Sequence, residues 1–179
     1  PMEPAQTANL KNGLLFEMPM PDGSFQRFQI FEYAMMHPDL AAKFPSIKTY
    51  TGQGIDDASA SIKLDVTQLG FHAMTLSPNG SVCIATYNKN TSTEYICYDK
   101  KDLMRTSSFT CEFNDLTNGL IKVPDATSAQ RSSGTQLRTY RLAMACTGEY
   151  AAFYGGTISG AMAGIITTVN RVNGVYETE

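Results

Sequence analysis

The chain has 179 residues, of which 42% are hydrophobic and 17% are charged, and its formal net charge is -3. A chain of this length can bury a hydrophobic core, and the composition is ordinary for a globular domain. With no basic run, nucleic acid and acidic membrane surfaces are excluded as expected partners, and with no stretch of about 18 consecutive apolar residues no membrane span is predicted.

From residue 14 to about residue 100, the pattern predicts short strands joined by tight turns. Clusters such as Pro21-Asp22-Gly23 and Pro78-Asn79-Gly80 mark the turns. One helix is predicted over 33–44, with Pro38 breaking or restarting it near its middle. These elements predict an α+β fold, in which a mostly antiparallel sheet carries a helix on one face. The predicted strands cover 14–18, 24–32, 47–50, 60–66, 71–76, 81–87 and 94–98.

The last quarter of the chain predicts one strand followed by one long helix. Residues 138–145 alternate between two faces, as in a half-buried strand. Thr157 is a candidate N-cap, and apolar residues then recur at helical spacing over about six turns. Such a stripe must face a sheet or other helices, because packing supplies most of the stability of a helix. The stripe consists of Ile158, Ala161, Met162, Ile165, Val169, Val172 and Tyr176.

The segment VPDATSAQRSSGTQLR, between these two regions, is poor in apolar residues and rich in Ser, Thr, Gln and Gly. That composition predicts a polar linker, which we place at 124–136. Proteolytic nicking concentrates in exposed polar segments, so Arg131 is a candidate site for activation by a trypsin-like protease. A surface loop with an incidental arginine explains the same residues equally well.

Two of the four cysteines, Cys83 and Cys97, fall on consecutive predicted strands. With the turn centred on Asn90, the two cysteines are directly opposed. Opposed Cα atoms in a non-hydrogen-bonded antiparallel pair are about 4.5 Å apart, which a disulfide can span. We therefore expect a disulfide here, worth roughly 3 kcal/mol for a loop of about 15 residues. Two free buried thiols are the alternative.

Residues 137–179 read LRTYRLAMACTGEYAAFYGGTISGAMAGIITTVNRVNGVYETE. This segment, above all its motifs TGEY and NRVNGVYE, resembles the start of the catalytic domain of bacterial reprolysin-like zinc metallopeptidases, a branch of the metzincins. Upstream, HPDLAAKFPSIKTYTGQGIDDASASIKLD and GFHAMTLSPNG resemble the propeptide of the same precursors. The resemblance implies a propeptide domain at 1–123, the linker at 124–136, and the first strand and helix of an incomplete α/β catalytic domain at 137–179.

Metzincins bind zinc through His-Glu-x-x-His-x-x-Gly-x-x-His, in which the glutamate activates the metal-bound water. This chain has two histidines, His37 and His72, and neither has a partner four residues away. The resemblance therefore implies zinc in the full-length protease but none bound by this chain alone, which should not hydrolyse peptides. Its implied role is to keep a secreted or cell-surface protease latent and to assist its folding. Its partner would be the rest of its own catalytic domain or the mature protease.

The first residues, PMEPAQ, show no signal peptide, and we expect that a signal was removed upstream and that the chain is a piece of a longer precursor. A free-standing protease-inhibitory or binding module, or a cell-surface structural domain, is the alternative to the propeptide.

The resemblance also suggests roles for the other two cysteines. In latent metalloproteases a prodomain thiolate can take the open coordination position of zinc, so Cys111 is a candidate inhibitory ligand. The alternative is an ordinary structural cysteine, buried or paired with Cys146. Cys146 itself would pair with a cysteine beyond Glu179.

Overall fold

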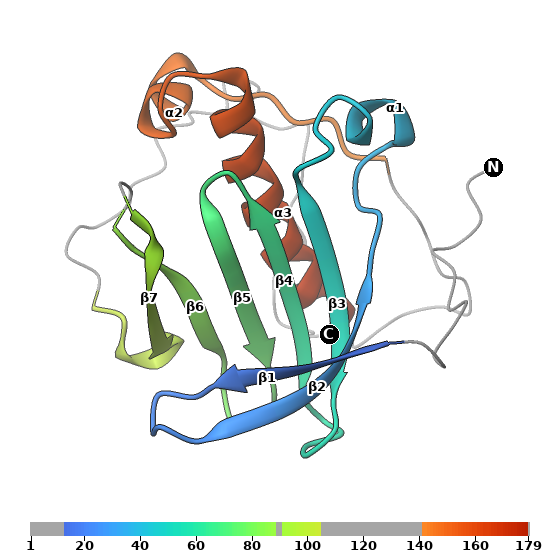
Figure 1. Cartoon of the computed structure of the whole chain (residues 1–179), viewed down its shortest axis with the longest axis vertical. Coiled ribbons are helices and arrows are strands. Elements are labelled where there is room, and N and C mark those ends of the chain that lie inside the picture. Colours follow the sequence, from blue (N-terminus) through green and yellow to red (C-terminus); the bar gives the residue numbers. More distant parts are fainter. Residues whose placement is uncertain (1–12, 89–90, 105–140, 179) are drawn as a thin grey trace, which may run out of the picture.

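The structure is a computed structural model, which describes residues 13–88, 91–104 and 141–178. One face of a seven-stranded antiparallel sheet curls around the main core, and the other face carries a long helix (Figure 1). The strands are neighbours in space in the order in which they occur in the chain. The elements are β1 Leu14–Pro19, β2 Phe25–Glu32, α1 Pro38–Ala41, β3 Lys48–Gly54, β4 Ser61–Thr67, β5 Gly70–Leu76, β6 Val82–Asn88, β7 Thr91–Asp99, the 3-10 helix η1 Lys100–Asp102, α2 Gly148–Phe153 and α3 Ile158–Thr178.

The first hairpin shows how the sequence sets the register of the sheet. Gly23 has a positive φ of 84°, which glycine adopts without steric cost, and it turns the chain between β1 and β2. Phe16 then lies opposite Phe28 across the hairpin. The hairpin curls across the rest of the sheet, as Figure 1 shows, so that the side chains of Met18 and Phe28 are fully buried.

This face of the sheet holds the main hydrophobic core. Because side chains alternate along a strand, β4 contributes Ile62 and Leu64 to the core while Lys63 and Asp65 point to the opposite face. Burial of such apolar side chains is the dominant favourable term in folding. The buried members of the cluster are Met18, Phe28, Ile30, Ala60, Ile62, Leu64, Ala73, Val82 and Ile84.

The helix predicted over 33–44 is mostly wrong. α1 covers four residues and begins at Pro38, whose ring fits the first turn of a helix, and the His37 side chain accepts a hydrogen bond from the Asp39 N–H. The apolar residues of the segment nevertheless serve a core. Met35 and Phe44 pack against Ile47 and one flank of α3, in a second cluster.

The long C-terminal helix is confirmed, and so is its start. The Gly160 N–H donates to the Thr157 hydroxyl over 3.0 Å, as at an N-cap. The strand predicted over 138–145 is wrong for the described residues 141–145, which have no regular structure and are exposed. A short helix, α2, follows instead and is capped by Thr147, whose hydroxyl accepts from the Tyr150 N–H over 3.3 Å.

The face that α3 presents to the sheet differs from the predicted one. Its sheet-facing positions carry small or polar residues, namely Thr167, Asn170 and Gly174. The predicted stripe lies largely on the other side of the helix, with Ala161 an exception. A Cβ at Gly174 would lie 2.9 Å from Cγ of Lys63, so this glycine lets the helix approach the sheet closely.

The α+β class with a helix on one face of an antiparallel sheet is therefore confirmed, but α3 is the covering helix. Within the described residues, no helix is long and apolar enough to cross a bilayer.

Candidate functional site

The contact between the sheet and α3 is the most unusual feature of the molecule, because five largely buried polar side chains meet there. They come from β4, β5 and α3, and we call them the polar layer. Proteins bury such groups only when partners are provided, since an unpaired polar group in the interior costs free energy. The polar layer consists of Lys63, Asp65, His72, Thr167 and Asn170.

Asp65 is the centre of the polar layer, with 1% of its surface exposed. The Thr167 hydroxyl donates to its Oδ2 over 2.7 Å, and Nδ1 of His72 lies 3.3 Å from the same oxygen. One carboxylate thus links β4, β5 and α3. Because its oxygen is shared between a residue of α3 and a residue of β5, Asp65 holds the helix at a defined position.

Lys63 makes the second link between sheet and helix. Its ammonium lies 2.6 Å from Oε2 of Glu177, in the last turn of α3, and 4.8 Å from the centre of the Tyr33 ring. The ring face attracts the cation. Burial raises the pKa of the Tyr33 hydroxyl, so this group stays neutral over the physiological range.

Asn170 makes the third link, because its side-chain amide donates to the Leu64 carbonyl over 3.0 Å. Its Oδ1 is buried and has no hydrogen-bond partner within the described residues, and the same holds for Nε and Nη2 of the neighbouring Arg171. Unsatisfied buried groups cost about 1–3 kcal/mol each. The sheet–helix contact is therefore specific in its geometry but weaker than an apolar contact of the same size.

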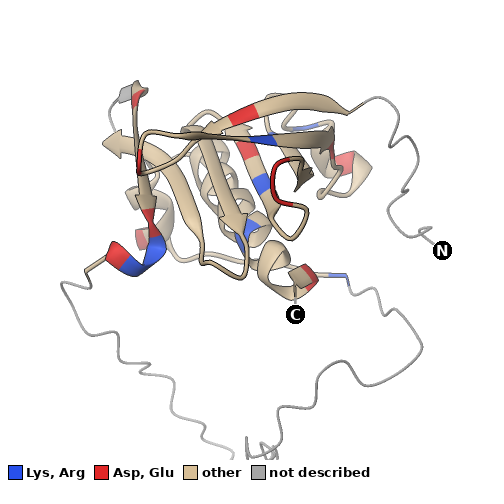
Figure 2. Ribbon diagram, turned by 90° about the horizontal axis from the view of Figure 1, so that it is seen from below, with Lys and Arg blue, Asp and Glu red and all other residues tan. Residues whose placement is uncertain are grey.

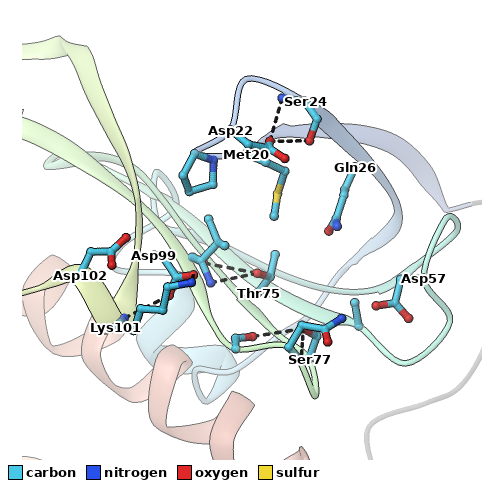
Figure 3. A pocket seen from close by; sticks show the side chains of 15 residues that line it. Met20, Asp22, Ser24, Gln26, Asp57, Thr75, Ser77, Asp99, Lys101 and Asp102 are labelled. Atoms are coloured by element: carbon cyan, nitrogen blue, oxygen red, sulfur yellow. Dashed lines mark hydrogen bonds and ion pairs between the residues drawn. The ribbon is translucent and has the colours of Figure 1, made fainter.

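A shallow groove of about 350 Å³ lies at the opposite end of the sheet strands from α2, below the β1–β2 turn (Figure 3). Figure 3 shows Asp22 and Ser24 on one rim, Asp99, Lys101 and Asp102 on another, and Thr75 between them. Two of these carboxylates already have local partners. Asp22 accepts from the Ser24 N–H and hydroxyl over 2.9 and 2.6 Å, and Asp99 pairs with Lys101 over 3.0 Å.

These local hydrogen bonds explain the electrostatics of the groove. The Ser24 hydroxyl lowers the pKa of Asp22, and the Lys101 N–H lowers the pKa of Asp99. Such bonds form turns and cap helices. Among the described residues, no group of three His, Cys, Asp or Glu side chains is placed to hold a metal ion. The groove offers polar surface, on which Asp22 and Asp99 bond to their neighbours in the sequence.

The structure does not bring Cys83 and Cys97 together, which corrects the prediction of a disulfide between them. Cys83 lies opposite Tyr98, and Cys97 lies opposite Ile84. The pairing register shifts between Thr86 and Asn88, so the two strands do not pair symmetrically about Asn90. Because a one-residue offset moves a side chain to the other face, Cys83 faces α3 and Cys97 faces the main core. Both are free thiols.

The other predicted site residues are dispersed or lie outside the described part of the chain. Cys111 and Arg131, together with the linker at 124–136, fall in the undescribed range 105–140. Cys146 is exposed and is a free thiol. Of the two histidines, His37 caps α1 and His72 belongs to the polar layer.

Sequence reasoning missed the polar layer, although a signal for it exists. In β4, which reads SIKLDVT, a lysine and an aspartate alternate with apolar residues, and this pattern normally predicts a solvated face. The matching signal lies in α3, where Thr167 and Asn170 fall on the same face as three glycines. A polar pattern in the strand and a matching one in the helix together indicate an interface, whereas each pattern alone indicates a solvent-exposed face.

Charged residues of both signs are interspersed along the strands and helices (Figure 2).

Comparison of the chain with protein-family models, with curated proteins and with solved structures finds no match.

Proposed function

We propose that this chain is the propeptide-containing part of a secreted reprolysin-like zinc metallopeptidase precursor, which keeps the protease latent and assists its folding. The observation that carries the proposal is the position of the motif NRVNGVYE, residues 170–177, which resembles part of the catalytic domain. Three of its residues, Asn170, Gly174 and Glu177, contact the sheet. The part of the chain that resembles a propeptide thus binds the part that resembles the start of a catalytic domain.

In this proposal the sheet acts as a template for the helix. An isolated helix is marginal in water, and packing on a preformed surface supplies most of its stability. Asp65 and Lys63 select the rotation and position of α3, because each binds one particular helix residue. The catalytic domain would fold onto a helix already in place and would be inactive while the propeptide contacts persist.

Zinc chemistry would come from residues outside this chain, since its two histidines do not lie in a His-Glu-x-x-His motif. Within the proposal, Cys111 is the candidate that would occupy the open position of the metal and displace the attacking water. Arg131 is the candidate cleavage site that would separate the propeptide. Cys146 would pair with a cysteine of the remaining catalytic domain.

The experiment is inhibition of the mature protease, released from its own precursor, by the 179-residue chain added in trans. Wild type is compared with Cys111→Ala and with Cys146→Ala, a control that removes an exposed thiol. We expect strong inhibition by wild type and by the control, with loss in Cys111→Ala and zinc retained throughout. Equal inhibition by all three chains would show that the propeptide inhibits by obstructing the cleft and not through the Cys111 thiolate. No inhibition by any of them would refute the latency role.

A free-standing inhibitory module is the second candidate, favoured by the fact that α3, through Ala163 and Ile166, already shares a core with Ile47 and the segment before β3. The two functions differ in the coding sequence that follows Glu179. A downstream His-Glu-x-x-His-x-x-Gly-x-x-His supports the precursor, and an open reading frame without it supports the module.

A further inference from the structure

Arg171 of α3 carries two buried hydrogen-bond donors that the described residues leave unpaired. The donors are Nε and Nη2 of its guanidinium group. The residue as a whole is partly exposed, so the guanidinium lies at the margin of the sheet–helix contact and can be reached from solvent by a small movement of the side chain. Folded proteins seldom leave buried donors without an acceptor, because the lost hydration of a charged group is costly.

The position of Arg171 on the helix identifies its neighbours. At 3.6 residues per turn, it points about 40° to one side of Thr167, towards the flank that carries Gly164. Tyr154 packs against that flank, since a Cβ at Gly164 would lie 2.5 Å from its ring. Long side chains in a helix lean towards its N-terminus, so Arg171 reaches back towards Tyr154. Burial raises the pKa of the Tyr154 hydroxyl, and the nearby charge of Arg171 opposes that rise.

The same flank of α3 lies towards β6 and β7. Ile166, on the opposite flank, packs against Ile47 just before β3, and the sheet continues from β3 through β4 and β5 to β6 and β7. Cys83 and Tyr98 are cross-strand partners on the helix side of these last two strands. Burial raises the pKa of both groups, and the charge of Arg171 opposes the rise at each. Strand residues and Tyr154 thus surround one guanidinium group.

The two unpaired atoms of Arg171 form one edge of the guanidinium plane. The N–H groups of Nε and Nη2 point in the same direction, as a fork whose geometry matches a carboxylate. This molecule uses the same edge in that way elsewhere. Nε and Nη2 of Arg27 donate to the carboxylate of Asp56 over 3.0 and 2.6 Å. Arg27 therefore shows which chemical group completes such an edge.

The described carboxylates near this end of the sheet and helix are paired with other residues. Asp99, at the end of β7, bonds to Lys101 over 3.0 Å, and Glu177, in the last turn of α3, bonds to Lys63 over 2.6 Å. The edge of Arg171 offers one positive charge and two parallel donors. A planar group with one negative charge and two oxygens matches it better than a phosphate dianion does.

From this edge we propose that Arg171 anchors a carboxylate-binding site on the flank of α3 that lies over β6 and β7. The carboxylate of the ligand accepts from Nε and Nη2, and the rings of Tyr98 and Tyr154 are placed to contact the rest of the ligand. The proposal is independent of the latency role, because it uses none of the hydrogen bonds that join the sheet to α3.

The first test follows the Nε–Hε resonance of Arg171 by NMR while sodium acetate replaces sodium chloride at constant ionic strength. We expect a saturable shift of this resonance, together with the amide resonances of Cys83 and Tyr154. Arg171→Lys keeps the charge but removes the fork, so acetate should no longer shift those amides. Arg27→Lys is the matched control, since its edge is already paired with Asp56, and binding of acetate should persist.

A second compound, N-acetyl-glutamate amide, distinguishes two sources of the carboxylate. Tighter binding of this compound indicates a polypeptide side chain as the natural ligand, and tighter binding of acetate indicates a free organic acid. Either result supports the site. The proposal is overturned if neither compound gives a saturable shift at Arg171, if chloride produces the same shift, or if inorganic phosphate binds more tightly than both.

The second test measures unfolding in urea with and without acetate at constant ionic strength. Arg171→Met replaces the charged fork with an apolar chain, and we expect its unfolding midpoint without acetate to be higher than that of wild type, because a buried unpaired charge is destabilising. Acetate should raise the midpoint of wild type alone, since a ligand that binds the folded state stabilises it. A lower midpoint for Arg171→Met, with the same response to acetate in both chains, would show that Arg171 serves only packing.

Discussion

The two faces of the sheet are built from the same strands but by different rules. One face is covered by the β1–β2 hairpin and is filled with apolar side chains, among which Phe28 and Ile62 are fully buried. The other face is covered by α3 and is filled by the polar layer. A single strand, β4, contributes Leu64 to the first face and Asp65 to the second.

The difference separates stability from specificity. Apolar burial is favourable at almost any orientation of the partners, whereas a buried hydrogen-bonded carboxylate is tolerated only when its donors are in place. The hairpin face therefore supplies most of the free energy of folding. The α3 face determines which surface of the helix meets the sheet and leaves the contact comparatively easy to reverse.

The largest expected effect comes from breaking the apolar face. Phe28→Ala should lower the free energy of unfolding by about 3–5 kcal/mol, because the large cavity would be only partly filled by relaxation. Urea denaturation measures the change. Phe25→Ala is the matched control on the same strand, where the ring is exposed, and it should change stability by less than about 0.5 kcal/mol. Similar losses in the two variants would contradict the placement of the core.

A smaller but more local effect is expected from Asp65→Ala. Thr167 and His72 would lose their shared acceptor, at a cost of about 2–3 kcal/mol. Hydrogen exchange should accelerate in α3 while β1 and β2 keep most of their protection, because the polar layer holds the helix and not the hairpin. Asp39→Ala, at an exposed position in α1, is the control. Uniform acceleration across the sheet would show that the two faces do not respond separately.

Thr167→Val removes one hydrogen bond and keeps the shape of the side chain. We expect a loss of about 1 kcal/mol by urea denaturation, which is typical of a single buried hydrogen bond, or slightly more because the acceptor is a carboxylate. Thr168→Val is the control, since the Thr168 hydroxyl bonds only within the helix to the Gly164 carbonyl and the residue is exposed. Equal effects at the two threonines would count against a role for Asp65 in orienting α3.

The smallest effect concerns pH and the cysteines. Burial raises the pKa of the Cys83 thiol above its ordinary value. A group with a raised folded-state pKa contributes stability that is complete below the unfolded pKa of about 8.5 and is lost as the pH rises through the folded pKa. Stability should therefore fall slightly above pH ~8.5, and Cys83→Ser should reduce that fall.

Thiol labelling tests the burial of the cysteines directly. Among the three described cysteines, iodoacetamide should modify the exposed Cys146 first, then Cys97, and then the buried Cys83, as read by mass spectrometry of tryptic peptides. A peptide pair joined through Cys83 and Cys97 without added oxidant would contradict the placement of these residues on opposite faces.

Local sequence patterns were sufficient for most of the sheet. Turn clusters such as Pro21-Asp22-Gly23 delimit strands by backbone sterics alone, and all seven strands of the sheet overlap their predicted ranges. Thr157 likewise marks the start of α3 because an N-cap is a local hydrogen bond. The strand at 138–145 failed in its described part because alternation is a property of side chains, whereas a strand also needs a neighbour to bond with its backbone.

The features that depend on other parts of the chain were not predictable in this way. The orientation of α3 was missed because the sheet supplies polar partners for Thr167 and Asn170, so these residues face the sheet and most of the predicted apolar stripe does not. The disulfide was expected wrongly because a register shift between Thr86 and Asn88 moves Cys83 by one position relative to Cys97. Both errors arise from assuming that an apolar or symmetric pattern alone decides what faces inward.

The order of the strands has a further consequence for how α3 is attached. Each strand pairs with its neighbours in the sequence, whereas Thr167 and Asn170 contact residues 102 and 106 positions away. The covalent connection between them acts as a tether that raises the local concentration of the helix beside the sheet. A single cut between residues 104 and 141 would remove the tether, and α3 would become a dissociable ligand of the sheet, held only as long as its concentration exceeds its dissociation constant.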